Sequence, residues 1–333
     1  MHIPENYLSP ATCGVLTAAM APIWYISIQK VKKNVPADKL PLLGIAAAFS
    51  FVVMMFNIPL PGGTTGHAVG GTLAAIMLGP WGACLAISTT LLVQALFFGD
   101  GGILALAANC FNMAFVLPMI GYGIYKLLHA HIPNPVAAGI GGYVGINAAA
   151  FAAAVEFGLQ PILFTNEYGQ ALYCPYPLSI SIPAMMIGHL TIFGLAEAIF
   201  TGGMAAFLAK SNQDSLLPHA QNSLAVGYSK TNKSVTALYT SLIIMIILTP
   251  LGLLAEGTAW GEWAPEEIAE LAENGSALGY TPAGLLDGFS LDVFFPDYAV
   301  SSMPEIYGYI LSAVMGTAVL IIAFKLISAV AAK

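Results

Sequence analysis

The sequence predicts an all-α polytopic membrane protein with about nine transmembrane helices. Of its 333 residues, 58% are hydrophobic and only 8% are charged, whereas a soluble domain carries about 25% charged residues. Apolar runs of about 20 residues, the length that crosses a bilayer, recur along the chain. The ten basic residues are all Lys and occur in a few short stretches. A surface this poor in charge must face lipid over most of its area.

The apolar runs divide the chain into two groups of helices. Residues 1–209 form a seven-helix unit, residues 210–235 form a polar cytoplasmic linker, and residues 236–333 form a two-helix unit. The third run is short and Gly79-Pro80 ends it, so it need not cross the bilayer alone. The expected spans are 10–29, 41–57, 67–79, 81–98, 102–129, 135–157, 177–209, 236–256 and 304–330.

The positions of the Lys residues predict the orientation of these helices. Cytoplasmic loops of membrane proteins carry the excess of Lys and Arg. Nine spans with the N-terminus outside place all ten Lys on or near the cytoplasmic side. Segment 257–303, which is acidic and contains no Lys, then lies outside. It is either a solvated acidic surface or a segment whose field attracts cations.

Several function classes are disfavoured by what the sequence lacks. The absence of Arg argues against nucleic-acid binding, and no Walker motif for ATP hydrolysis occurs. The four Cys residues are widely spaced and suggest neither a metal site nor a disulfide framework. The N-terminus lacks the features of a cleavable signal peptide. We therefore expect the chain to begin at Met1 and ATP to be hydrolysed by other subunits.

His2 is a candidate metal ligand because of its place in the chain. The Met1 amine, the His2 amide nitrogen and the His2 imidazole can close two small chelate rings around one ion. Nitrogen donors in a square plane are typical of Ni(II) and Cu(II). The alternative is a His that follows the initiator Met by chance.

His67 lies in the Gly-rich stretch 61–71, which this topology places outside with the N-terminus. Irregular backbone at the membrane boundary is tolerated where it is buried in protein or lines a cavity. The His67 imidazole would supply the fourth nitrogen of a square plane. The alternative is a His that only hydrogen-bonds its own loop. A helix N-terminus next to a cation is unfavourable, and a deprotonated amide ligand would partly offset this effect.

Other polar residues within the predicted spans are candidates for supporting the site or forming an ion path. They either pack behind the ligands or contact the ion directly. Asp100, in a Gly-rich stretch, is expected to be a turn residue. His129, His131 and His219 are expected to be solvated or to lie at helix ends. The supporting candidates are Asn57, Asn109, Asn112, His189 and Glu197.

The chain resembles the CbiM/NikM family in motifs that cover most of residues 1–209. These are Met1-His-Ile-Pro-Glu-Asn-Tyr-Leu-Ser-Pro10, Pro61-Gly-Gly-Thr-Thr-Gly-His-Ala-Val-Gly-Gly71, Leu78-Gly-Pro-Trp81, Leu92-Val-Gln-Ala-Leu-Phe-Phe-Gly-Asp-Gly-Gly102, Ala108-Asn-Cys-Phe-Asn-Met113, and Gly188-His-Leu190 with Glu197. Residues 236–333, with Pro282-Ala-Gly-Leu285 and Pro296-Asp-Tyr298, look like the small CbiN/NikN component fused to the first.

The resemblance implies the substrate-capturing (S) component of a nickel or cobalt energy-coupling-factor transporter in a prokaryotic cell membrane. It also implies metal ligation by Met1, His2 and His67, and three partners: a transmembrane coupling (T) protein and two cytoplasmic ATPase subunits. Ni(II) or Co(II) would be the transported substrate rather than a cofactor. The chain departs from the family at Glu5-Asn6, where Asp-Gly is usual, and at Ala68, where a larger apolar residue is usual.

The predicted function is therefore capture of Ni(II), or Co(II), at the outer face for ATP-driven uptake, without enzymatic activity. Three alternatives remain: a cobalt-specific component that supplies cobalamin synthesis, an autonomous metal-ion transporter, and an intramembrane metalloenzyme. An autonomous transporter would favour inverted repeats and several intramembrane charges. A metalloenzyme would need an activating carboxylate and an open coordination position.

Overall fold

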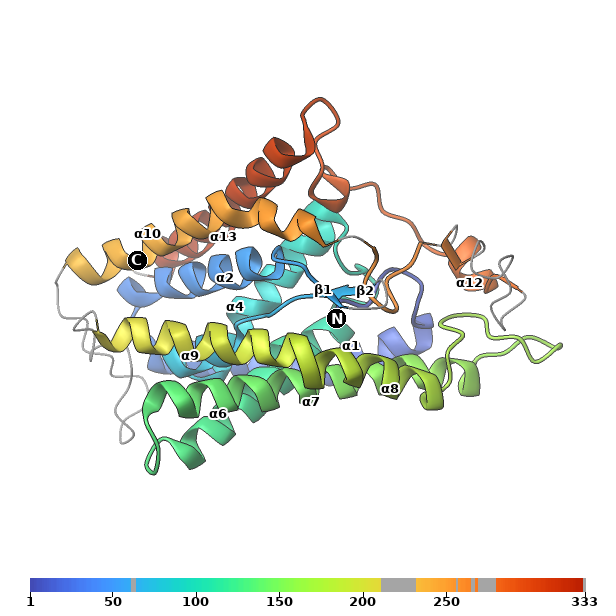
Figure 1. Ribbon diagram of the computed structural model, residues 1–333, viewed down its shortest axis with the longest axis horizontal. Coiled ribbons are helices and arrows are strands. Elements are labelled where there is room, and N and C mark those ends of the chain that lie inside the picture. The colour runs from blue at the N-terminus through green and yellow to red at the C-terminus, as the bar shows by residue number, and fades with distance from the viewer. Residues whose placement is uncertain (61–63, 211–231, 256, 265–266, 269–279, 332–333) are drawn as a thin grey trace.

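The computed structural model describes residues 1–333 apart from 61–63, 211–231, 256, 265–266, 269–279 and 332–333. Most of its long helices run roughly along the longest axis of the molecule (Figure 1). Up to residue 210 the helical segments are α1 (Pro10–Asn34), η1 (Ala37–Lys39), α2 (Pro41–Met54), α3 (Gly71–Leu78), α4 (Pro80–Val93), η2 (Gln94–Phe98), α5 (Leu106–Asn109), η3 (Cys110–Val116), α6 (Leu117–Leu128), α7 (Asn134–Leu163), α8 (Leu178–Gly188), η4 (His189–Phe193) and α9 (Gly194–Lys210).

The C-terminal part contributes two further long helices. Its segments are α10 (Asn232–Leu248), η5 (Thr249–Leu254), α12 (Ala283–Leu286), η6 (Pro296–Tyr298) and α13 (Glu305–Ala331). Of the predicted linker 210–235, residues 211–231 lie outside the described residues. The predicted outer segment 257–303 is described only in part, and α12 and η6 lie within it.

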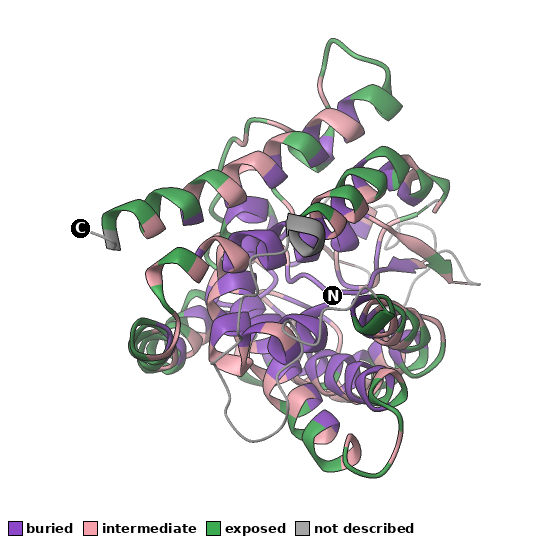
Figure 2. Ribbon diagram, turned by 90° about the vertical axis from the view of Figure 1, so that its left-hand side faces the viewer, coloured by how far each residue is buried: buried purple, intermediate pink, exposed green. Residues whose placement is uncertain are grey.

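The prediction of a polytopic membrane protein is confirmed. In the described part of the chain, eight helical stretches are long and apolar enough to cross a membrane. Their outer faces are exposed, while buried residues gather at the centre of the bundle (Figure 2). The eight stretches are Pro10–Asn34, Ala37–Met54, Pro80–Phe98, Leu106–Leu128, Asn134–Leu163, Leu178–Lys210, Thr236–Leu254 and Glu305–Val330.

The third predicted span, 67–79, is not a spanning helix. It contains α3, which has eight residues and is therefore about 12 Å long, against a hydrocarbon core of about 30 Å. Gly70 precedes α3 with φ 75°, and Gly79 follows it with φ 76°, so both ends leave helical geometry. The count of nine spanning helices is therefore not reached among the described residues.

Small residues allow the helices to pack closely, as is common in membrane bundles. A Cβ on Gly141 of α7 would lie 2.6 Å from the Gly121 carbonyl oxygen of α6. On the opposite side of α7, a Cβ on Gly139 would lie 3.0 Å from the Ala198 carbonyl oxygen of α9. In the same way, Gly316 lets α13 pack on Phe51 of α2. The C-terminal helices are thereby joined to the body of the bundle.

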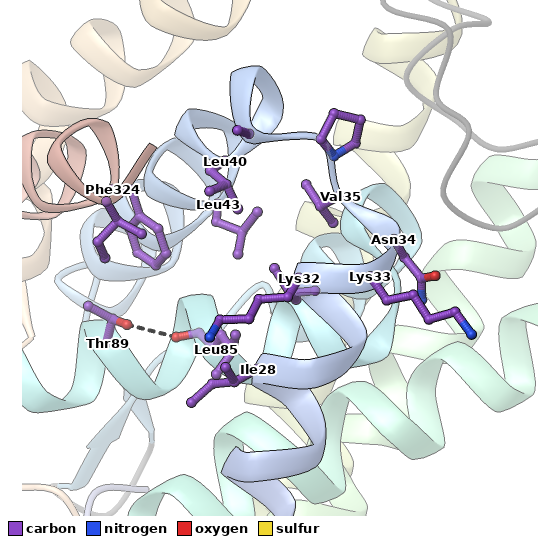
Figure 3. Close-up of a pocket in the computed structure, with 14 residues that line it drawn as sticks. Ile28, Lys32, Lys33, Asn34, Val35, Leu40, Leu43, Leu85, Thr89 and Phe324 are labelled. Carbon is purple, nitrogen blue, oxygen red and sulfur yellow. Dashed lines mark hydrogen bonds between the residues drawn. The ribbon is translucent and has the colours of Figure 1, made fainter. Parts of the chain in front are cut away.

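Two cavities lie at opposite ends of α2 and α13. A cavity of about 780 Å³ is lined by Leu40 and Leu43 from the start of α2 and by Phe324 near the end of α13. Figure 3 shows Lys32 extending across this cavity toward Leu85. The second cavity, of about 310 Å³, lies at the other end of these helices, where the N-terminus of the chain is buried.

Candidate metal site

The N-terminal residues are buried inside the bundle. Met1, His2 and Ile3 expose 4%, 2% and 0% of their surface. Both main-chain polar groups of Ile3 pair with Asn109: the amide donates to Oδ1 over 2.7 Å, and Nδ2 donates to the carbonyl over 3.0 Å. The Gly102 amide donates to the same carbonyl over 2.9 Å. Asn109, predicted as a supporting residue, thus holds the N-terminal segment.

Ser9 ends this segment and begins α1. Its hydroxyl accepts a hydrogen bond from the Thr12 amide over 3.0 Å, and Pro10 occupies the first helical position. Both features favour helix initiation. The position of α1 therefore fixes how far residues 1–8 reach into the cavity.

The departure from the family at Glu5-Asn6 is accommodated without disturbing the N-terminus. Glu5 accepts hydrogen bonds from the Ile103 and Leu104 amides over 2.7 and 3.2 Å. Asn6 has φ 67°, a left-handed conformation that Gly adopts freely and Asn tolerates. Its side chain also pairs with both main-chain polar groups of Phe289, over 2.8 and 3.0 Å.

His67 follows a two-stranded hairpin formed by β1 (Ile58–Leu60) and β2 (Thr64–Gly66), which pair antiparallel. Its Nδ1 lies 3.0 Å from the Ala68 carbonyl oxygen. Since a carbonyl only accepts, Nδ1 carries the proton and Nε2 keeps its lone pair. That Nε2 lies 3.2 Å from His2 Nδ1. The structure therefore brings together two imidazoles that are 65 residues apart.

The Met1 amine, predicted as a ligand, contacts the C-terminal part of the chain. It donates to Glu262 Oε1 over 2.8 Å, and the side chains expose 1% and 21% of their surface. Glu262 belongs to the acidic segment 257–303, so this segment reaches one of the predicted ligands. No local signal indicates the pairing, because the two residues are 261 positions apart.

Asp100 was predicted only as a turn residue, and it also faces His2. The turn is present, since Gly99 and Gly101 have φ 72° and 83°. In addition, Asp100 Oδ1 lies 3.1 Å from His2 Nδ1. Its other oxygen accepts hydrogen bonds from the Tyr298 hydroxyl and, over 3.1 Å, from Gln94 Nε2. Sequence reasoning missed Asp100, Tyr298 and Glu262 as neighbours of the site.

Burial changes the protonation of these groups. Desolvation, followed by the charge of the neighbouring amine, lowers the pKa of the His2 imidazole to about 4. Desolvation also raises the pKa of the Asp100 carboxyl. The His2 ring is therefore neutral near pH 7, which is the form that binds metals.

Glu197, a further predicted supporting residue, holds the main chain just after His67. Its Oε2 accepts hydrogen bonds from the Val69 and Gly70 amides over 2.7 and 2.9 Å, and its Oε1 accepts one from Thr201 over 3.2 Å. The carboxylate thus lies at the N-terminus of α3, where its negative charge offsets the positive potential of the helix dipole. This resolves the electrostatic difficulty of placing a cation near His67.

Replacing Glu197 by Ala is expected to lower the free energy of unfolding by about 2–4 kcal/mol, because two buried amides lose their acceptor. It should also weaken metal binding by displacing His67. Thermal unfolding and metal titration of purified protein measure the two effects, and Glu197→Gln, which keeps one acceptor oxygen, should give smaller changes. An Ala variant as stable as the parent would contradict this role.

The other supporting candidates lie in different places. Asn57 lines the 310 Å³ cavity with His2 and His67. His189 Nδ1 donates to the Met185 carbonyl over 2.8 Å, and its ring contacts the ring of Phe193 edge-on. Asn112 pairs with Glu156 over 2.8 Å. His189 and Asn112 have no direct contact with the N-terminal residues among the interactions described.

The site has the donors for a small square-planar ion. Two cis nitrogens bound at about 2.0–2.1 Å lie about 2.9 Å apart, close to the 3.2 Å between His2 Nδ1 and His67 Nε2. In the described part of the chain, no group of three His, Cys, Asp or Glu side chains has metal-binding geometry. The Met1 amine and the His2 amide are the main-chain donors next to the two imidazoles.

Comparisons with known proteins identify the family of the chain. Residues 2–215 match the CbiM family, described as a cobalt uptake substrate-specific transmembrane region, and residues 234–333 match the PDGLE domain. The chain is 47% identical over 323 residues to a probable fused nickel transport protein LarMN of Lactiplantibacillus plantarum, covering 96% of this chain and 95% of the relative. It is 46% identical to the fused nickel transport protein NikMN of Rhodobacter capsulatus, with the same coverage.

A solved structure also resembles this chain. It is described as a truncated transition metal transporter, and it superposes with a TM-score of 0.61 at 54% identity, covering 63% of this chain and 99% of that one. With more than half of its residues matched by the family model, this multi-pass membrane protein belongs to the CbiM family.

Proposed function

We propose that this protein is the substrate-capturing component of an energy-coupling-factor importer, and that it binds Ni(II), or Co(II), at the outer face of the membrane. The observation that carries the proposal is the pairing of two buried imidazole nitrogens 3.2 Å apart beside the buried N-terminal amine. Relatives that match almost the whole chain are named nickel transport proteins, and shorter matches are named cobalt transport proteins.

The proposed ligands are the Met1 amine, the His2 amide nitrogen and imidazole, and the His67 imidazole. A nitrogen binds a metal only through its lone pair, so Met1 must leave Glu262 and lose a proton when the ion enters. The His2 amide must also lose its proton, and the proton on His2 Nδ1, which faces Asp100 Oδ1 and His67 Nε2, must leave that nitrogen. The carboxylates of Glu262 and Asp100 then provide negative charge next to the bound cation. Both lie at the cavity, so they also lower the cost of bringing a dication there.

Transport would require partners that supply energy. We assign these roles to a transmembrane coupling protein and two cytoplasmic ATPase subunits, following the family. The metal site lies at the end of α2 and α13 opposite the cavity that carries Lys32 and Lys33. Lys favours the cytoplasmic side, so this arrangement supports an outward-facing site and an outside N-terminus.

Uptake of radioactive nickel into cells tests the function directly. Uptake is expected only when the coupling protein and ATPases are co-expressed, and elemental analysis of the purified protein should show about one nickel per chain. Uptake that needs no ATPase would support the autonomous transporter instead. Purified protein that binds neither nickel nor cobalt would contradict metal capture altogether.

Nickel is expected to bind more tightly than cobalt and to give a diamagnetic site. The reason is that four nitrogens in a plane, one of them an amide, suit the ligand field of Ni(II) better than that of Co(II). Competition between the two ions, followed by magnetic measurement of the nickel complex, tests this. Cobalt bound about tenfold more tightly, which corresponds to about 1.4 kcal/mol, would make the protein a cobalt component.

A further inference from the structure

We propose that Tyr298 of the C-terminal segment positions the metal-binding imidazole of His2 through Asp100. The inference rests on the proposed function, because it assigns a role in metal binding. It goes further by making the fused C-terminal segment a structural part of the site rather than a separate appendage. Asp100 and Tyr298 act here as positioning residues and are not themselves proposed as ligands.

The two oxygens of the Asp100 carboxylate contact different partners. Oδ2 receives two donors: the Tyr298 hydroxyl, and Gln94 Nε2 at 3.1 Å. Gln94 Nε2 also lies 3.0 Å from the Tyr298 hydroxyl, which closes a triangle of three polar groups. With Oδ2 held in this way, Oδ1 faces His2 Nδ1 at 3.1 Å. The carboxylate has little freedom to turn away from the imidazole.

Asp100 contacts Nδ1 of the His2 ring. The chelate that includes the His2 amide can close a six-membered ring only through Nδ1. In the structure, Nδ1 faces both Asp100 Oδ1 and His67 Nε2, at 3.1 and 3.2 Å. A 180° flip of the ring would put Cδ2, a carbon, in the place of Nδ1 and break both contacts. Asp100 therefore holds the imidazole in the orientation that the chelate requires before the ion arrives.

Tyr298 is held in place by several contacts. Its ring stacks on Phe98 with centroids 4.9 Å apart, and its carbonyl accepts a hydrogen bond from Ser312 over 2.8 Å. Tyr298 and Asp297 have φ 62° and 51°, a left-handed conformation that is uncommon for residues other than Gly. Such a conformation persists where surrounding contacts determine it, and it occurs often at functional sites.

The C-terminal segment thus contacts two of the proposed ligands from two points. Tyr298 acts on the His2 imidazole through Asp100, and Glu262 contacts the Met1 amine directly at 2.8 Å. A movement of Glu262 and Tyr298 would change the surroundings of both ligands together. The geometry therefore makes metal affinity depend on the positions of these two residues.

The test compares Tyr298→Phe with Tyr309→Phe in the full-length protein. Tyr309 is also buried, packs against Tyr298 at 5.6 Å between ring centroids, and donates its hydroxyl to the Met55 carbonyl over 2.8 Å. Each variant removes one buried hydroxyl from the C-terminal part of the chain, but of these two hydroxyls only that of Tyr298 donates to Asp100 among the interactions described. Ni(II) affinity by chelator competition, the ligand-field absorption band of the nickel complex, and the melting temperature are measured for each.

We expect Tyr298→Phe to weaken Ni(II) binding about tenfold, as loss of a group that orients a ligand commonly does, and to shift the absorption band. Tyr309→Phe should change only the melting temperature. Asp100→Ala should exceed Tyr298→Phe in its effect, and Asp100→Asn, which keeps an oxygen, should be milder than Asp100→Ala.

Unchanged affinity and absorption in Tyr298→Phe, or equal losses in both Tyr variants, would overturn the inference. Wild-type protein and His67→Ala are measured beside them. Wild-type protein that binds neither nickel nor cobalt would instead refute the proposed function, so the two failures are distinguishable.

Discussion

A single Ala placed before Met1 is expected to weaken Ni(II) binding by orders of magnitude while both imidazoles stay in the chain. The added residue turns the amine of Met1 into a peptide nitrogen and moves the new amine out of the five-membered chelate ring. The structure sharpens this expectation because Met1 is 4% exposed and its amine lies 2.8 Å from Glu262. An extra residue would also have to displace the N-terminal segment.

The measurement is metal affinity by chelator competition, with mass spectrometry to verify that the added Ala is retained. N-terminal acetylation should give the same loss, because it removes the basic lone pair while adding few atoms. A tag placed after Lys333 serves as the control and should leave affinity unchanged. Near wild-type affinity in a correctly folded, alanine-extended protein would eliminate the amine as a ligand.

His2→Ala and His67→Ala are expected to reduce Ni(II) affinity by about 10²–10³-fold each. Four ligands of a tight metal site together supply about 10–16 kcal/mol, so one ligand contributes about 2.5–4 kcal/mol, which corresponds to that factor. His67→Ala also removes the acceptor at 3.2 Å from His2 Nδ1. Calorimetric or chelator-competition titration of the purified variants gives the affinities.

His129→Ala is the matched control within the described chain. His129 follows α6 and stacks on Tyr125 with ring centroids 5.2 Å apart, and Lys126 nearby marks the end of the bundle away from the metal cavity. His219→Ala is a second control, although this residue lies outside the described residues. Both should bind nickel like the parent protein. A folded His67→Ala protein with parental affinity would place the site elsewhere.

Most of the helices were predictable because a membrane-spanning helix satisfies its backbone polar groups within one segment. A local run of about 20 apolar residues is therefore enough to define it, and the stretches at 10–34, 134–163 and 305–330 are such runs. The third predicted span is too short to cross the membrane, and local hydropathy does not reveal why. Its first residues are held outside the helix by Glu197, which is 128 positions from Val69.

The chemical identity of the proposed ligands was likewise a local property. The amine, amide and imidazole of residues 1 and 2 are joined by covalent bonds, so their chelating geometry follows from their position alone. The Asn6 position shows the same locality. Its φ of 67° is left-handed, a conformation that Asn adopts more readily than most other residues.

By itself the sequence determined the membrane class, most helix boundaries and the residue types able to bind metal. Only the tertiary structure decided which carboxylates reach that site. Asp100 was predicted correctly as part of a turn, but its contacts with Tyr298 and His2 depend on the packing of three distant segments. Glu262 meets Met1 in the same way. The physical reason is that covalent and hydrophobic patterns act over a few residues, whereas hydrogen bonds between charged side chains form wherever folding places their atoms within about 3 Å.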